Sequence, residues 1–255
     1  MNKKIIFIIN SVQNQRCIKR INDFIDHGYF IIAYGYKRNT TIHTKPEKFE
    51  IEILDSIPNK KFYFFRLYVY LKNFNKIYKK YKNDNVIFYF FGLDIALIGS
   101  IFTHSFIYEE SDLSHTYIRN KHLVKILELI DRYIISRSKL TIFTSEGFLN
   151  YHFNDKDKFY NDKILVIPNK LNKEIIKLNY NNKKSINIKK LRIAFVGGAR
   201  FKSVLNFADV VAKNFPNHEI HFYGNPVDLV NSFQNLTQQY NNVFFHGPFR
   251  NPIDL

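Results

Sequence analysis

Short, uninterrupted runs of β-branched and aromatic residues recur along the chain, and most are followed by a longer stretch with helical spacing. We expect seven such runs to be strands: Lys4–Ile9, Tyr29–Ala33, Phe49–Leu54, Asn85–Phe91, Ser105–Glu109, Leu140–Thr144 and Ile164–Pro168. Helices are predicted at Arg16–Asp26, Phe62–Tyr81, Asp94–Phe102, Asn120–Ser136 and Glu146–Phe153. Strands that are apolar on both faces and alternate with helices indicate a parallel sheet covered on both sides.

The pattern is interrupted at Asn169–Lys190, which is rich in Asn and Lys, and then starts again. The second set of elements comprises strands at Arg192–Val196, Glu219–Tyr223 and Val243–His246, with helices at Val204–Asn214 and Asp228–Tyr240. This is one half of a doubly wound sheet. The sequence therefore predicts an α/β protein with two Rossmann-like domains, the second incomplete: residues 1–178, a linker at 179–190, and residues 191–255.

The net charge of +16, from 38 cationic and 22 acidic residues, favours anionic partners such as phosphorylated small molecules, acidic lipids or nucleic acid. The single cysteine, Cys17, excludes an internal disulfide and a cysteine-rich metal site, which fits a reducing cytoplasm. The apolar run Ile5–Ile9 is too short for a signal-peptide core. No run reaches the length of a spanning helix, so we expect a cytoplasmic chain that is soluble or peripheral on a membrane.

A glycine turn between the strand at Arg192–Val196 and the next helix is a candidate phosphate-binding loop. Gly197 and Gly198 would let the backbone approach a diphosphate, while Arg200 and Lys202 would neutralise its charge. The alternative is a turn that serves geometry and solubility alone. The loop matches neither the dinucleotide-binding Gly-x-Gly-x-x-Gly pattern nor a P-loop.

The order of several motifs resembles the GT-B glycosyltransferases, and within them the retaining family four. The motifs are the first loop NSVQNQRCIKRI (Asn10–Ile21), IYEESDL (Ile107–Leu113), LTIFTSEGFLNYH (Leu140–His152), ILVIPNKLN (Ile164–Asn172), VGGARFK (Val196–Lys202) and NVFFHGPF (Asn242–Phe249). Lys170 stands where the family usually has glycine. The resemblance covers nearly the whole chain and implies transfer of a sugar from a nucleoside-diphosphate sugar, with retention of configuration, to a glycan or lipid-linked acceptor in surface polysaccharide biosynthesis.

The resemblance also implies site residues. Gly197, Gly198, Arg200 and Lys202 would bind the donor diphosphate, with no cofactor and no metal required. The family's Glu-x7-Glu pair, which holds the donor's ribose and sugar, is absent: the acids after Leu191 are Asp209, Glu219, Asp228 and Asp254. We therefore expect a truncated second domain and poor activity from the 255 residues alone.

An acidic cluster follows the fifth predicted strand, where α/β proteins place functional loops. We interpret Glu109, Glu110 and Asp112 as catalytic residues that contact the acceptor or the reacting sugar. The predicted cleft and acceptor residues are Asn10, Asn14, Arg16, Asp94 and His115. The alternatives are a solvated capping turn at the cluster, a weakly supported metal site, and a helix-capping role for Asp94.

The segment Lys60–Lys82 contains eight cations, nine aromatic residues and no acid. This composition suits an anionic membrane surface, and Lys72, Lys76, Lys79 and Lys80 are the predicted membrane-facing residues at the inner face of the plasma membrane. A helix with one packed aromatic face, or a nucleic-acid contact, are the alternatives.

Three other functions stay open at this point. A nucleotide-sugar 2-epimerase shares the predicted fold but would need its own acid and base carboxylates. A non-catalytic nucleic-acid-binding protein would use the basic surface, although no helix-turn-helix, zinc-finger or RNA-recognition motif is present, and no nucleic-acid partner is expected. A non-catalytic scaffold is the third.

Overall fold

The structure is a computed structural model, and it divides into two compact units, Met1–Lys170 and Leu171–Leu255. It describes residues 4–12, 14–38, 46, 48–58, 63–113, 118, 120–153, 162–168, 189–197, 202–224 and 229–247. Most of the predicted linker, residues 179–188, lies outside the described residues, as does the predicted boundary at 178. The linker therefore stays a prediction, and each unit is described by itself.

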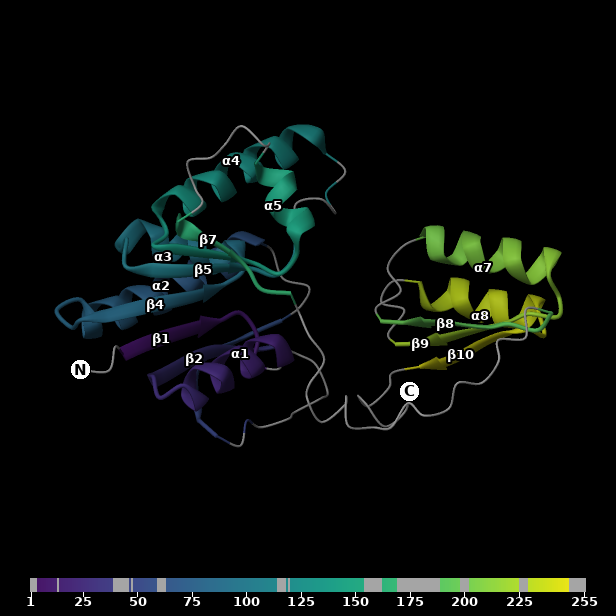
Figure 1. The fold of residues 1–255 in the computed structure, drawn as a ribbon, viewed down its shortest axis with the longest axis horizontal. Coiled ribbons are helices and arrows are strands. Elements are labelled where there is room, and N and C mark those ends of the chain that lie inside the picture. Colours follow the sequence, from purple (N-terminus) through teal and green to yellow (C-terminus); the bar gives the residue numbers. More distant parts are fainter. Residues whose placement is uncertain are drawn as a thin grey trace. The chain divides into compact units, whose positions relative to one another are not determined.

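The first unit is built on a parallel sheet of seven strands in the order β3-β2-β1-β4-β5-β6-β7 (Figure 1). The strands are β1 (Lys4–Ile9), β2 (Phe30–Arg38), β3 (Ile51–Ile57), β4 (Val86–Phe91), β5 (Phe106–Glu110), β6 (Leu140–Phe143) and β7 (Ile164–Val166). The helices are α1 (Gln15–Asp26), α2 (Tyr63–Tyr81), α3 (Leu93–Phe102), α4 (Lys121–Arg137) and α5 (Glu146–His152). Chain order reverses between β1 and β4, which makes this the topological switch point where open α/β sheets bind ligands.

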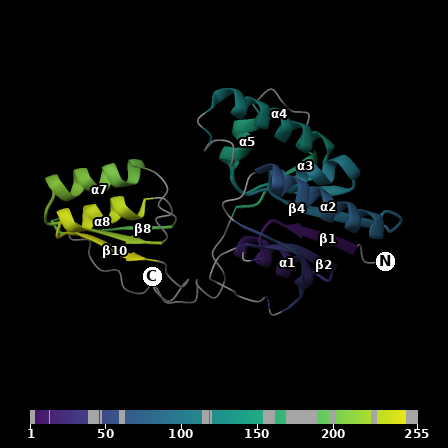
Figure 2. The same cartoon turned by 180° about the vertical axis from the view of Figure 1, so that it is seen from behind.

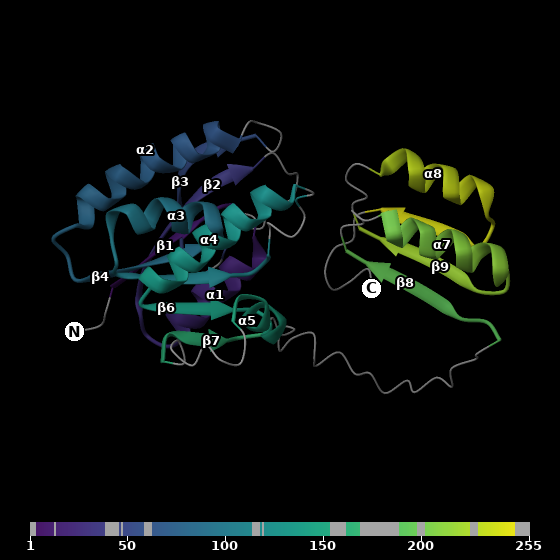
Figure 3. The same ribbon diagram turned by 90° about the horizontal axis from the view of Figure 1, so that it is seen from above.

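Two apolar layers cover the two faces of this sheet because alternate side chains of each strand point to opposite sides. Ile6 and Ile8 pack toward α2, α3, α4 and α5, whereas Ile5 and Phe7 pack toward α1. Helix α1 lies on one side of the sheet, next to β1 and β2 (Figure 2), and α2, α3 and α4 lie on the other side (Figure 3). The expected parallel sheet with helices on both sides is confirmed.

Local sequence fixes where the helices near the switch point begin. Asn14 caps α1 by accepting a hydrogen bond from the Arg16 amide over 3.1 Å. Helix α3 begins after Gly92, whose φ of 89° lies in the region that favours glycine. A Cβ at that position would lie 3.3 Å from Asn10 Nδ2, so glycine also allows the end of β4 to approach the end of β1.

The second unit contains a parallel three-stranded sheet in the order β10-β9-β8. Its elements are β8 (Arg192–Val196), α7 (Lys202–Asn214), β9 (Glu219–Tyr223), α8 (Val230–Gln239) and β10 (Val243–Gly247). Both helices cover the face that carries Ile220 and Phe222 (Figure 1). On the opposite face His221 stacks on His246, with ring centroids 5.2 Å apart.

The predicted strands all form, and three of them, β1, β8 and β9, have the predicted bounds. The largest difference is β2, which continues to Arg38 rather than ending at Ala33. Tyr34 and Tyr36 are buried at 2% and 1% exposure, because their rings enter the layer beneath α2. The polar appearance of Tyr-Gly-Tyr-Lys concealed this continuation.

Candidate functional site

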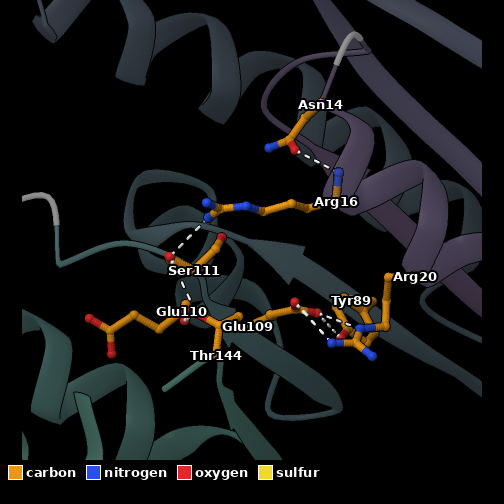
Figure 4. Close-up of polar contacts among 8 residues, drawn as sticks. All are labelled: Asn14, Arg16, Arg20, Tyr89, Glu109, Glu110, Ser111 and Thr144. Atoms are coloured by element: carbon orange, nitrogen blue, oxygen red, sulfur yellow. Dashed lines mark hydrogen bonds and ion pairs between the residues drawn. The ribbon is translucent and has the colours of Figure 1, made fainter. Parts of the chain in front are cut away.

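The loop after β5 meets the start of α1 at the carboxyl edge of the first sheet, the edge formed by the carboxyl ends of its strands. Arg16 Nη1 donates to the Ser111 carbonyl over 3.2 Å (Figure 4). The same atom lies 3.7 Å from Asp112 Oδ1. Thr144 at the end of β6 donates to the same carbonyl over 3.3 Å. The Asp112 side chain is 64% exposed. The predicted residues Asn14, Arg16 and Asp112 therefore come together here, within reach of a ligand.

Glu109 points to the α1 side of the sheet, where it is buried. Its carboxylate accepts two hydrogen bonds from Arg20, 3.0 Å from Nε and 3.3 Å from Nη2, and a further one from the Tyr89 hydroxyl (Figure 4). Burial and the negative charge of Glu109 raise the pKa of Tyr89 well above its usual value. A bidentate arginine and a neutral phenol therefore stabilise one buried carboxylate.

Glu110 points away from Glu109, to the α4 and α5 side (Figure 4). His152 Nε2 lies 2.9 Å from its Oε2 and 3.7 Å from Asp131 Oδ2, and Tyr108 donates to Asp131 Oδ1 over 2.9 Å. Burial raises the pKa of Glu110 and of Asp131 to about 8 each, and burial lowers the pKa of His152. The raised pKa of Glu110 and the lowered pKa of His152 both favour the uncharged forms. At neutral pH, protonated Glu110 therefore donates a hydrogen bond to neutral His152.

Glu110, Asp131 and His152 are also the one group of described residues whose ligand atoms lie close enough to share a metal ion. Within this group His152 lies within hydrogen-bond distance of Glu110, and Tyr108 donates to Asp131. Glu109 and Glu110 are only 1% and 2% exposed, whereas the Asp112 side chain is 64% exposed, so Asp112 is the acid of this cluster that solvent reaches. The two glutamates instead contact buried partners on the two faces of the sheet, Arg20 and His152.

Two further predicted residues lie at the switch point. Asp94 is in the first turn of α3, where it accepts from the Tyr63 hydroxyl over 3.1 Å and lies 2.5 Å from Arg66 Nη2. Gly92 occupies the N-cap position, so the capping role considered for Asp94 is wrong. The Asn10 carbonyl accepts a hydrogen bond from Arg38 Nε over 3.1 Å. His115 lies outside the described residues.

Glycines end all three strands at the carboxyl edge of the second sheet. Gly197, Gly224 and Gly247 have φ values of 137°, 138° and 76°. A Cβ on Gly224 would lie 1.9 Å from the Gly197 carbonyl oxygen, so the strand ends pack more closely than any other residue permits. Helix α7 begins at Lys202 with no acid in its first turn. Gly198 and Arg200 lie outside the described residues, so their roles in diphosphate binding stay predictions.

The predicted membrane-facing lysines lie on α2. Lys72, Lys76 and Lys79 are exposed and continue a stripe that begins with Phe64 and Tyr68, which are 82% and 61% exposed. Lys80 is also exposed, but its amine donates to the Tyr34 hydroxyl over 3.3 Å and turns back toward the protein. Among the helices that the structure describes, none has the length and apolarity needed to cross a bilayer.

A surface hollow of about 660 Å³ lies away from all these residues. It is formed by the end of α1 and the first residues of β2 and β3, and its lining includes Lys48, Glu50 and Glu52. The first residues of parallel strands lie at the amino edge of a sheet, opposite the edge that carries reactive groups in α/β proteins. We therefore assign no site to this hollow.

Sequence comparison alone finds no relatives: no protein-family model matches, and no curated protein matches significantly. Solved structures do match. The apo lipopolysaccharide outer core galactosyltransferase WaaB is 17% identical with a TM-score of 0.55, and the match covers 98% of this chain and 69% of that one. The catalytic domain of starch synthase IV from Arabidopsis thaliana, bound to ADP and acarbose, is 10% identical with a TM-score of 0.64, covering 99% and 76%.

A UDP-N-acetylglucosamine 2-epimerase from Rickettsia bellii also matches, with 12% identity, a TM-score of 0.53, and coverage of 96% of this chain and 68% of that one. The chain therefore has the GT-B fold of two Rossmann-like domains, the fold shared by these glycosyltransferases and UDP-N-acetylglucosamine 2-epimerases.

Proposed function

We propose that the chain is a retaining glycosyltransferase that transfers a sugar from a nucleoside-diphosphate sugar to a glycan or lipid-linked acceptor in surface polysaccharide biosynthesis. The observation that carries this proposal is the glycine-ended edge of β8, β9 and β10, followed by a helix that starts at Lys202 without an acid. Free amides and the positive end of a helix dipole at such an edge attract a diphosphate.

The proposed roles of the residues follow from the chemistry of sugar transfer. As the glycosidic bond breaks, negative charge gathers on the leaving diphosphate, so the α7 amides, Arg200 and Lys202 would stabilise the transition state. Arg16 and Asp112, exposed on the first unit, would contact the acceptor or the reacting sugar. This scheme needs no cofactor and no metal.

A ligand-dependent thermal shift tests the donor site. The full chain is heated with UDP, GDP, CMP and their sugar conjugates, and one diphosphate series is expected to raise the melting temperature. Lys202→Ala should abolish that shift, because it removes the cation at the first turn of α7. Lys213→Ala, in the last turn of the same helix, is the matched control and should preserve it. A shift that survives Lys202→Ala and Arg200→Ala would remove this loop from the proposal.

The second candidate is a nucleotide-sugar 2-epimerase, favoured by the match to the Rickettsia bellii enzyme. The two reactions differ in their need for an acceptor. Proton NMR of a UDP-N-acetylhexosamine incubated with the chain alone would show a new sugar configuration for an epimerase. A transferase would leave the configuration unchanged until an acceptor is added.

We also propose that the first unit docks on the anionic inner face of the plasma membrane. The stripe on α2 presents aromatic rings at one end and lysines at the other. Helix α4, on the same face of the sheet, adds a second exposed apolar row: Leu123, Ile126, Leu129 and Tyr133. Rings at head-group depth and lysines near acidic lipids are the two contributions that hold peripheral proteins on bilayers.

Vesicle co-sedimentation tests the docking face. Binding to vesicles containing phosphatidylglycerol should exceed binding to pure phosphatidylcholine and should fall with salt. Phe64→Ser combined with Tyr68→Ser should weaken it. The control is Phe207→Ser, which removes a similarly exposed ring, 53% accessible, from α7 in the second unit. Equal loss in both variants would show nonspecific apolar adhesion instead.

A further inference from the structure

Two arginines that the proposed function leaves unused lie at the switch point of the first sheet. Arg38 is the last residue of β2, and its guanidinium is held by two hydrogen bonds, from Nε to the Asn10 carbonyl over 3.1 Å and from Nη2 to the Tyr70 hydroxyl over 2.7 Å. No carboxylate of the described residues lies within ion-pair distance of Arg38. Its orientation is therefore fixed while its charge has no acidic partner in this part of the chain.

Arg66 approaches the same place from the first turns of α2. Its Nη2 lies 2.5 Å from Asp94 Oδ2, its Cζ lies 4.8 Å from the centre of the Tyr63 ring, and its buried Nε has no hydrogen-bond partner in the described part of the chain. Burial raises the pKa of Tyr70 to about 12, while the charges of Arg38 and Arg66 lower it and that of Asp94 raises it. Arg66 and Tyr70 are four residues apart on α2 and so lie on the same side of that helix, and Arg38 donates to Tyr70, which places the two arginines near one another.

The surroundings add further donors. Asn10 ends β1 and Gly92 ends β4, so the group lies beside the reversal of strand order. Helix α3 starts there with no side-chain hydrogen bond at its N-cap, which leaves the first amides of a ten-residue helix facing the carboxyl edge. Two arginines, one aspartate and a helix N-terminus give the switch point a net positive field.

We propose that Arg38 and Arg66 form a site for the phosphate or diphosphate group of a phosphorylated acceptor, separate from the donor loop of the second unit. The assignment to an acceptor rests on the proposed function. Oriented guanidinium groups match phosphate oxygens in bidentate geometry, which a flexible lysine does not. Arg38 would use Nη1, which takes part in neither of these two hydrogen bonds, and Arg66 would supply the second charge.

Isothermal titration of the full chain with inorganic pyrophosphate at low ionic strength tests the site. Arg38→Gln and Arg66→Gln should each weaken binding about tenfold, as expected for loss of a charge-assisted pair. Arg38→Lys should also weaken binding several-fold, because lysine keeps the positive charge but lacks the paired donors of the planar guanidinium group. Lys37→Gln, a neighbouring exposed cation on β2, is the matched control and should change affinity less than about twofold. Thermal melting verifies that each variant is folded.

A second titration with saturating UDP present separates the two sites. Unchanged pyrophosphate affinity under UDP, and loss in Arg38→Gln but not in Lys202→Ala, would support the proposal. Competition by UDP, loss confined to Lys202→Ala, or equal losses in Arg38→Gln and Lys37→Gln would overturn it. If none of UDP, GDP and CMP binds, the donor assignment fails, while the Arg38, Arg66 and Lys202 variants still decide the phosphate site.

Discussion

Glu109 and Glu110, adjacent at the end of β5, have different surroundings on the two faces of the sheet. On the α1 side, Glu109 meets Arg20 and the Tyr89 hydroxyl. On the α4 and α5 side, Glu110 meets His152 and lies near Asp131. Both side chains are almost completely buried, so burial alone does not decide the outcome.

A buried carboxyl group can be stabilised by a permanent cation or by loss of its own charge. A guanidinium remains charged at all ordinary pH values, so it stabilises Glu109 as an anion. His152 and Asp131 can exchange protons instead, and removal of water favours the uncharged form of every member of that cluster. On one side of β5 Glu109 therefore forms an ion pair with Arg20. On the other side Glu110, Asp131 and His152 share protons.

The largest expected effect comes from breaking the ion pair. Arg20→Ala should lower the free energy of unfolding by about 3–5 kcal/mol, because Glu109 would remain buried without its cation. Urea denaturation at pH 7 measures the change. The comparison variant is Arg192→Ala, which breaks a 2.7 Å pair with Glu219 that is 77% exposed on the arginine side and should cost about 0–1 kcal/mol. Equal costs would refute the distinction between the two environments.

Removing one hydroxyl on each side compares the two clusters directly. Tyr89→Phe should cost about 1.5–3 kcal/mol, since its hydrogen bond goes to a charged carboxylate. Tyr108→Phe should cost about 0.5–1.5 kcal/mol, since Asp131 carries a proton near neutral pH. Both are measured by urea unfolding at pH 7. A larger cost for Tyr108→Phe would show that Asp131 is ionised.

The proton-sharing side should also give the protein a pH-dependent stability. The folded pKa values of Glu110 and Asp131 are raised, so the folded state holds their protons more tightly and stability falls as pH rises toward 8. His152 has a lowered pKa and costs stability only below its ordinary value of 6.5. Between pH 6.5 and 8 the free energy of unfolding should therefore fall by about 1 kcal/mol per pH unit for each carboxyl.

Glu110→Gln should reduce that slope by about half, because the amide still donates to His152 but does not titrate, while Asp131 still does. Asp112→Asn, which changes an exposed carboxylate two residues away, is the matched control and should leave the slope unchanged. Denaturation series at several pH values measure both. An identical slope in Glu110→Gln and the unaltered chain would assign the pH dependence elsewhere.

The smallest effect on stability is expected at the exposed pair Arg16 and Asp112. Arg16 and Asp112 are 46% and 64% exposed and 3.7 Å apart, so Arg16→Ala should change the free energy of unfolding by only about 0–1 kcal/mol. The same variant should reduce release of nucleoside diphosphate in a transfer assay if Arg16 contacts the substrates. A variant that unfolds readily, or one that keeps full transfer, would remove Arg16 from the proposed site.

Several buried partners of the glutamates could have been suspected from the sequence. Arg20 lies three residues after Cys17 and four before Phe24, so helical spacing places it on the apolar face of α1. Asp131 likewise precedes the buried Ile134 and Ile135 by three and four residues. A charged residue on an apolar helix face indicates a buried partner. It does not reveal which partner, because Arg20 and Glu109 are 89 positions apart.

The sequence by itself determined the elements and the fold class, because apolar runs of strand length and helical spacing are local properties of the chain. It also placed Asn14, Arg16 and Asp112 near one another, since loops after parallel strands share one edge. Which glutamate forms an ion pair and which is neutral depends on the tertiary structure, as does the hydrogen bond from Arg38 to Tyr70 on α2. Those outcomes depend on which face of β5 lies against α1 and how α2 crosses the switch point, and packing between distant segments sets both.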